Sequence, residues 1–254
     1  MTPVQPVRFQ KLERIEDLER VVSLLCEVWE AESPVDLINA SNLKLMVEAD
    51  GYIVGMFTDQ DEMIGAAVAI RGKDALHSHF VGVRPGHQGR GLGYLLKQDE
   101  AEWAKDEGFR VIRWTYDPLV RRNAYFNLAK LSSKVLSYKR NYYGELNDGL
   151  NDNDETDRLM IEWEFTDGEP MRLTAPMEAD SWDFTERPAA LLDLGDGVHQ
   201  LVPTPADIEK LRLHEPERAQ AWRSGVRAGF AKAETEGYEV TGFTPDGWYV
   251  LRRP

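Results

Sequence analysis

The spacing of hydrophobic residues over the first 165 positions predicts strands and helices in alternation. Strands are expected at residues 7–12, 52–60, 62–72, 76–83, 110–116, 135–144 and 158–165. Helices, in which apolar side chains recur every three or four positions, are expected at residues 15–32, 33–51, 93–108 and 117–131. Residues 59–62 are typical of a tight turn, so the second and third strands are expected to form a hairpin.

Polar residues mark the start of one helix and a gap between two strands. Asp117 and Pro118 suit the N-cap and first position of the helix at 117–131. Residues 144–157 are acidic and show no periodicity, which predicts an exposed loop between two strands.

After Phe165 the hydrophobic pattern weakens. Residues 169–188 are irregular, and short strands are expected at 189–194 and 199–204. Residues 216–237 predict a helix, and residues 238–253 predict a hairpin around a Pro-Asp-Gly turn. The chain therefore ends in a helix followed by two strands.

The composition is that of an ordinary globular protein, with 42% hydrophobic and 29% charged residues in 254. The N-terminus lacks the apolar region of a secretory signal, and the apolar run at 64–70 is too short to span a bilayer. Cys26 is the single cysteine and lies in an apolar helical pattern, so we expect a core residue in a reducing cytoplasm.

Charge is unevenly distributed between the two parts of the chain. Residues 1–144 hold 19 Lys and Arg against 20 Asp and Glu, whereas residues 145–254 hold 11 against 24. Basic residues are not clustered, so a nucleic-acid partner is not expected. The acidic second part is interpreted as a solubility feature.

Three alternate glycines, Gly89, Gly91 and Gly93, stand between the strand at 76–83 and the helix at 93–108. The first turn of a helix presents free N–H groups, and glycine lets an anion approach the backbone closely. A phosphate site is therefore indicated. The dinucleotide pattern GxGxxG fails because Tyr94 and Leu96 occupy its last position in either register, and a Walker Gly-Lys-Ser/Thr sequence is missing.

Residues 88–93 read Gln-Gly-Arg-Gly-Leu-Gly, directly after a strand that ends in VGVRP. Loop, strand and helix together resemble the GNAT superfamily of acyl-CoA-dependent N-acyltransferases, over most of residues 7–144. The segments LHSHFVGV, WTYDPLVRRNAYFNLAKL and NYYG, with TDRL and EW further on, resemble a less characterised bacterial branch. Some members of that branch are associated with N-succinylation of amino acids, alongside N-succinylamino-acid racemases.

The resemblance implies an α/β fold with a twisted mixed sheet and helices on both faces. Residues 1–165 would form the acyltransferase domain, and residues 166–254 an α+β extension packed on it. The implied reaction moves an acetyl or other short acyl group, such as succinyl, from acyl-CoA to the primary amine of a small molecule such as an amino acid. The amine attacks directly in a ternary complex. No metal, membrane or nucleic acid is expected, and a homodimer is left open.

Alternatives to this reaction remain. The acceptor is a protein or peptide amine, or the protein is a catalytically silent acyl-CoA sensor. An interaction scaffold that uses the acidic second part is a further alternative.

The resemblance also implies which residues hold coenzyme A. They are the backbone around Val81 and Val83 for the pantetheine, the loop of Gln88, Gly89, Arg90, Gly91, Leu92 and Gly93 for the pyrophosphate, and Asn123 and Phe126 for the cofactor arm.

Two histidines are candidates for the general base. His77 matches the position where many family members carry a carboxylate, and His79 shares its face because side chains alternate along a strand. An imidazole with a pKa of about 6.5 can take a proton near neutral pH. Structural hydrogen bonding is the alternative, and a metal site lacks an evident third ligand.

The acid that protonates the departing thiolate is less defined. The family's usual tyrosine has no counterpart in either alignment of the helix at 117–131, so Tyr142 is the candidate, with Tyr143, Tyr125 and water as alternatives. Asp117 is interpreted as an N-cap or as a contact for the substrate ammonium. Arg158 is interpreted as a clamp for a substrate carboxylate or as a salt-bridge partner.

Overall fold

The structure, a computed structural model, describes residues 6–144, 154–165 and 191–254. Contacts divide the chain into two compact units, and the division falls between Trp114 and Thr115, inside a strand. The domain boundary predicted near residue 165 stays a prediction, and the predicted irregular segment at 169–188 lies outside the described residues.

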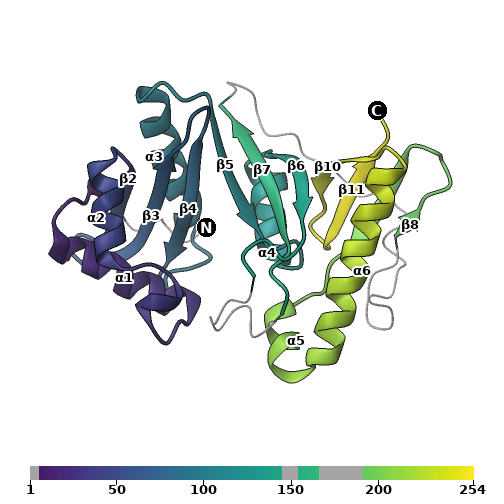
Figure 1. Cartoon of the computed structure of the whole chain (residues 1–254), viewed down its shortest axis with the longest axis horizontal. Helices are drawn as coiled ribbons and strands as arrows, with labels where there is room; N and C mark the ends of the chain where they lie inside the picture. Colours follow the sequence, from purple (N-terminus) through teal and green to yellow (C-terminus); the bar gives the residue numbers. More distant parts are fainter. Residues whose placement is uncertain (1–5, 145–153, 166–190) are drawn as a thin grey trace. The chain divides into compact units, whose positions relative to one another are not determined.

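In the described residues of the first unit, the strands have the order β1-β2-β3-β4-β5 (Figure 1). Neighbours from β1 to β4 are antiparallel, and β4 and β5 are parallel. The strands are β1 (Arg8–Lys11), β2 (Tyr52–Phe57), β3 (Met63–Arg71), β4 (Leu76–Val83) and β5 (Val111–Tyr116).

Helices cover both faces of these strands. The helical elements are α1 (Ile15–Trp29), the 3-10 turn η1 (Pro34–Asp36), α2 (Ala40–Glu48) and α3 (Leu92–Asp106). The apolar stripe of α1 packs with Ile53, Val68 and Phe80 in the main core. On the opposite face, Tyr52 donates a hydrogen bond to Asp99 of α3 over 2.6 Å. The alternation of Tyr52 and Ile53 explains why β2 is buried on both sides.

The second unit begins with the end of β5. Its helical elements are α4 (Arg121–Ala124), which continues into a π-helical turn η2 (Tyr125–Lys130), α5 (Ile208–His214) and α6 (Pro216–Thr235). Its strands are the antiparallel pair β6 (Lys134–Lys139) and β7 (Arg158–Glu164), and a four-stranded sheet in the order β10-β11-β9-β8. The latter comprises β8 (Leu192–Asp193), β9 (His199–Pro203), β10 (Glu239–Phe243) and β11 (Trp248–Arg252).

The α6 helix packs on this four-stranded sheet through its apolar side. A Cβ at Gly229 would lie 3.2 Å from Val202 of β9, and the ring of Phe230 lies 5.0 Å from that of Tyr249. The predicted mixed sheet with helices on both faces, and the α+β character of the C-terminal part, are therefore confirmed.

A buried ion cluster ties together distant segments of the second unit. Arg212 and Arg223 both bind the carboxylates of Asp117 and Asp154, and none of the four side chains exceeds 9% exposure. Arg223 reaches Asp117 with two hydrogen bonds of 2.8 and 2.9 Å. Burial alone would raise the pKa of Asp117, but the charges of Arg223 and Arg212 hold it well below its ordinary value. The cluster connects the residue just after β5, the segment before β7, α5 and α6.

Three sequence predictions are wrong in detail. The predicted helix at 117–131 begins only at Arg121, because the Asp117 carboxylate and carbonyl instead accept the N–H groups of Leu119 and Val120 in a turn. The predicted helix at 33–51 is interrupted at Asn39, whose side chain caps α2.

The third error concerns the loop predicted to be exposed. Its first part lies outside the described residues, but Asp154, Thr156 and Asp157 at its end are buried. The carboxylates of Asp154 and Asp157 and the hydroxyl of Thr156 bind groups inside the second unit. Arg227, for example, pairs with Asp157 at 2.8 Å.

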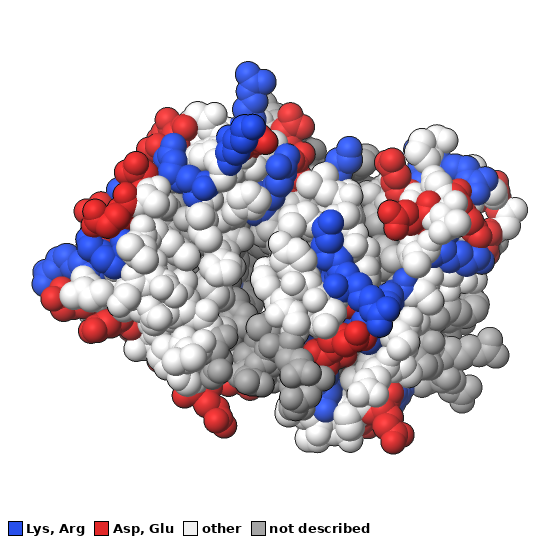
Figure 2. All heavy atoms as spheres, viewed as in Figure 1, with Lys and Arg blue, Asp and Glu red and all other residues white. Residues whose placement is uncertain are grey.

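The surface carries both charge signs. Figure 2 shows Lys and Arg side chains interspersed with Asp and Glu side chains over the visible face. Within the described residues, every helix is too short or too polar to cross a membrane.

The ion cluster gives a test of the fold. We expect Asp154→Ala to lower the free energy of unfolding by about 3–5 kcal/mol, because it leaves Arg212 and Arg223 buried with too little negative charge. The measurement is urea denaturation of the whole chain. Lys232→Ala, which removes an exposed ion pair with Glu236, is the control and should cost less than about 1 kcal/mol. Equal losses of unfolding free energy in the two variants would contradict a stabilising role of the ion cluster.

Candidate active site

The β4 and β5 strands separate soon after they meet. Their parallel register joins Leu76 to Ile112 and His77 to Arg113, whereas β3 and β4 are in register over seven pairs. Strands that run parallel without pairing leave N–H and C=O groups without sheet partners, and a ligand can satisfy such groups. The separation opens on the β5 side of β4, as the resemblance implies for a pantetheine site.

The register between β3 and β4 determines which β4 residues face that opening. Arg84 donates its N–H to the carbonyl of Ile64 over 2.9 Å, so Gly82, two residues earlier, also bonds to β3. Val81 and Val83 therefore turn their backbone groups away from β3, toward the β5 side. The Val83 carbonyl accepts a hydrogen bond from Gln88 Nε2 over 3.0 Å, which joins the strand to the following loop.

A β-bulge lies in the middle of β4. Val68 pairs with Phe80 and Ala69 with Ser78, so His79 is an extra residue opposite that step. Side-chain contacts agree: Ser78 faces α3, where its Oγ contacts Lys97, and Phe80 faces α1, where its ring contacts Trp29. Ser78 and Phe80, which are two positions apart and would share a face of a regular strand, thus lie on opposite faces.

Both histidines of β4 reach solvent. A Cβ placed on Gly72 would lie 2.6 Å from Cδ2 of His77, so glycine is required there for the imidazole to fold over the hairpin end. The ring of His79 packs on that of Phe80, with centroids 4.2 Å apart. Desolvation by the surrounding protein lowers the pKa of His79 below its ordinary value, which favours the neutral imidazole.

The loop after β4 presents free amides at the start of α3. Gly86, Gly89 and Gly91 have φ angles of 85°, 75° and 80°, a region that side chains other than glycine rarely occupy. The N–H groups of residues 88–93 donate no hydrogen bond within the described part of the chain. The first amides of α3 also lie at the positive end of the helix dipole, so this loop is suited to bind an anion.

Space remains open beside the glycines. A Cβ placed on Gly89, Gly91 or Gly93 would have no atom within 4 Å. Packing within the protein therefore does not require glycine at Gly93, whose φ is not positive. Arg90 stabilises the turn by donating to the Gly86 carbonyl over 3.1 Å.

A buried ion pair lies behind β4. Lys97 of α3 donates to Ser78 Oγ over 2.7 Å and to Glu100 over 2.8 Å, and its ammonium lies 3.7 Å from the centroid of the Trp114 ring. Lys97 is 3% and Glu100 0% exposed, and desolvation lowers the pKa of Lys97. The pair holds Ser78, the residue between the two histidines, against α3. Sequence reasoning did not identify it, although Lys97 and Glu100 fall on the apolar side of α3, next to Leu96 and Ala101.

The other predicted site residues belong to the second unit. They are Asp117, Asn123, Phe126, Tyr142 and Arg158. Tyr142 is 45% exposed and its ring lies 4.7 Å from that of Tyr143. Asn123 and Phe126 lie on the α4–η2 segment. Their roles toward a ligand, and that of Tyr142, stay predictions.

Asp117 and Arg158 are occupied in the structure. Asp117 is held by Arg212 and Arg223, so a substrate ammonium would have to displace an arginine there. Arg158 is buried, donates to the Asp157 carbonyl over 2.9 Å, and lies over the Tyr143 ring at 5.4 Å. Contacts to substrate stay predictions for both residues. The described residues contain no group of three or more His, Cys, Asp or Glu side chains suited to a metal.

Comparison with known proteins agrees with the geometry. Residues 12–126 match the model of the GNAT family of acetyltransferases. No curated protein matches the chain. A probable acetyltransferase from Staphylococcus epidermidis has a similar fold, with a TM-score of 0.52 and 13% identity over 63% of this chain and 100% of that one. An N-acetyltransferase from Staphylococcus aureus gives 0.50 and 11%, over 63% and 97%.

These identities are low, so the structural likeness concerns the fold. The family match agrees with two features of the structure. The sheet separates between β4 and β5, and a glycine loop precedes α3. Residues 12–126 of this chain form a domain of the GNAT family of acetyltransferases.

Proposed function

We propose that the protein is an N-acyltransferase that moves an acetyl or other short acyl group from acyl-CoA to the primary amine of a small molecule in the cytoplasm. The observation that supports this most is the loop of residues 88–93, whose amides are free and whose glycines leave open space at the start of α3. Coenzyme A has the two parts that such a site would bind: an anionic pyrophosphate for this loop and an extended arm for the unpaired edge of β4.

Each part of the cofactor has a partner in this proposal. The amides of residues 90–93 bind the pyrophosphate, with help from the α3 dipole. The pantetheine amides pair with the backbone of Val81 and Val83, as an added strand would. The predicted contacts of Asn123 and Phe126 with the cofactor arm are part of the same proposal.

The reaction removes two protons from the nitrogen, one before attack and one after it, and supplies one to the sulfur. A histidine of β4 takes the proton of the substrate ammonium, and the neutral amine then attacks the thioester carbon. A C–N bond forms, the C–S bond breaks, and the thiolate takes a proton from Tyr142 or water. The proton that the attacking nitrogen loses as the amide forms restores that donor. An N–H of β4 near the bulge, that of Val81 or a neighbour, stabilises the tetrahedral oxyanion. The thioester is already activated, so no covalent enzyme intermediate is required.

Gly93 allows the phosphate site to be tested without disturbing the fold. Gly93→Asp places a carboxylate in the first turn of α3, where the helix dipole favours negative charge, so the stability of the protein should be kept. The same carboxylate should repel the pyrophosphate and weaken CoA binding at least tenfold in isothermal titration calorimetry. Gly93→Ala, a small neutral change, is the control and should weaken binding less. Unchanged CoA affinity in Gly93→Asp would exclude the loop as the phosphate site.

The pH profile tests the histidines. Because desolvation lowers the pKa of His79, a base at this position stays neutral below the usual imidazole pKa of about 6.5. The acid limb of kcat against pH should therefore have its midpoint below 6.5, and His79→Asn should remove that limb. The assay follows CoA release from acetyl-CoA or succinyl-CoA with amino acids, polyamines and peptides as acceptors.

Other outcomes of this assay assign the chemistry differently. A limb lost only in His77→Asn would place the base at His77, and a limb kept in both variants would exclude a histidine base. Binding of acyl-CoA without release for any amine would favour the sensor alternative over the transferase.

A further inference from the structure

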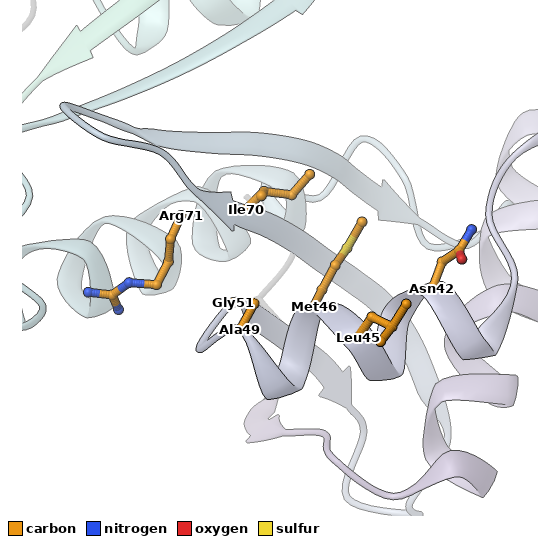
Figure 3. A pocket seen from close by; sticks show the side chains of 7 residues that line it. All are labelled: Asn42, Leu45, Met46, Ala49, Gly51, Ile70 and Arg71. Atoms are coloured by element: carbon orange, nitrogen blue, oxygen red, sulfur yellow. The ribbon is translucent and has the colours of Figure 1, made fainter.

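A pocket of about 310 Å³ lies between α2 and the ends of β2 and β3 in the first unit (Figure 3). It lies outside the loop and the strand edge assigned to coenzyme A. Its lining comprises Asn42, Leu45, Met46, Ala49, Gly51, Ile70 and Arg71. This volume is at the lower end of those that hold small molecules, about 300–1,000 Å³.

The lining of this pocket is mainly apolar. Leu45 is 69% and Ile70 38% exposed, so two large aliphatic side chains meet water here. Figure 3 shows the side chains of Met46 and Ile70 directed into the same space from α2 and β3. Arg71 contributes little charge to it, because its guanidinium turns away and pairs with Glu107 at 2.6 Å. The pocket therefore suits an apolar group.

The strand register connects this pocket to the candidate base. Ile70 of β3 pairs directly with His77 of β4. Directly opposite residues in antiparallel strands carry their side chains on the same face, with Cβ atoms about 4.5–5.5 Å apart. A ligand whose amine lies at His77 can therefore place a substituent against Ile70 without crossing the sheet.

The pocket lies at the opposite end of β4 from the glycine loop. Val83 follows His77 by six positions, which corresponds to about 20 Å at about 3.3 Å per residue. Phosphate groups bound at the loop are thus well removed from Ile70 and Leu45. A ligand in the pocket is therefore separate from the phosphate end of the cofactor.

We infer that the acceptor amine carries an apolar substituent, of the size of a leucine or phenylalanine side chain, which binds in the pocket of Leu45, Met46 and Ile70. The inference rests on the proposed transferase function. It narrows the acceptor class from any primary amine to amines with a hydrophobic group, such as apolar amino acids.

The test compares leucine with asparagine, which has nearly the same shape but a polar side chain, and with alanine. We expect kcat/KM for leucine to exceed that for asparagine at least tenfold. Leu45→Gln should lower kcat/KM for leucine about tenfold through KM, with kcat and the values for alanine nearly unchanged. Val35→Gln is the matched control, because Val35 is 88% exposed and does not line the pocket. Equal use of leucine and asparagine, or no effect of Leu45→Gln, would overturn the inference and leave the transferase standing.

A binding measurement separates this inference from the transferase itself. The methyl resonance of Met46, labelled with carbon-13 and assigned with Met46→Leu, should shift on addition of leucine and not of asparagine. If no amine releases CoA, the transferase proposal fails, and the Met46 signal then tests only whether the pocket binds an apolar side chain. A shift with leucine would support an apolar binding site in the pocket, and no shift would exclude it.

Discussion

The candidate site of the first unit depends on a length of β4 backbone that has no partner strand on one side. Backbone N–H and C=O groups that lose water must find partners, and β4 obtains them from β3 on one side along seven residue pairs. On the other side the register with β5 ends after His77. Val81 and Val83 then present donors and acceptors in the spacing of a strand, which fits the amides of an extended ligand.

The surroundings of β4 hold this arrangement in place. The bulge at His79 changes which face the following residues occupy, and the buried Lys97–Glu100 pair holds Ser78 just before it. A charge pair so deeply buried needs good geometry to offset its desolvation, and here a hydroxyl and an aromatic ring supply further contacts. Contacts with α3 thus position the strand that carries both candidate bases, and the first turn of α3 also forms part of the glycine loop. The second unit is held by a different kind of contact, the shared ion pairs of Asp117, Asp154, Arg212 and Arg223.

Much of the fold follows from local patterns. The helices α1, α3 and α6 have clear helical periodicity, and the hairpins of β2–β3 and β10–β11 have turn residues at the right places. The glycine loop was also predictable, because its glycines stand between a strand and a helix. By contrast, α5 has only seven residues and ends just before Pro216, so its pattern is too short to recognise.

Long-range partners explain the remaining errors. Asp154 looked like part of an exposed acidic loop, but it is buried by Arg212 and Arg223, which lie 58 and 69 residues further along the chain. The bulge at His79 leaves no trace in the alternation of the sequence, because it depends on the register with β3. The pocket of Leu45, Met46 and Ile70 likewise requires α2 and β3 to be placed together.

Coenzyme A binding along β4 and at the loop before α3 can be observed at individual amides. Amide hydrogen exchange of the whole chain, with and without CoA, tests this most directly. We expect slower exchange at Val81, Val83 and residues 90–93 when CoA is present, with little change in β2 or α2. Unchanged exchange at these amides with CoA bound, or protection confined to other segments, would contradict it.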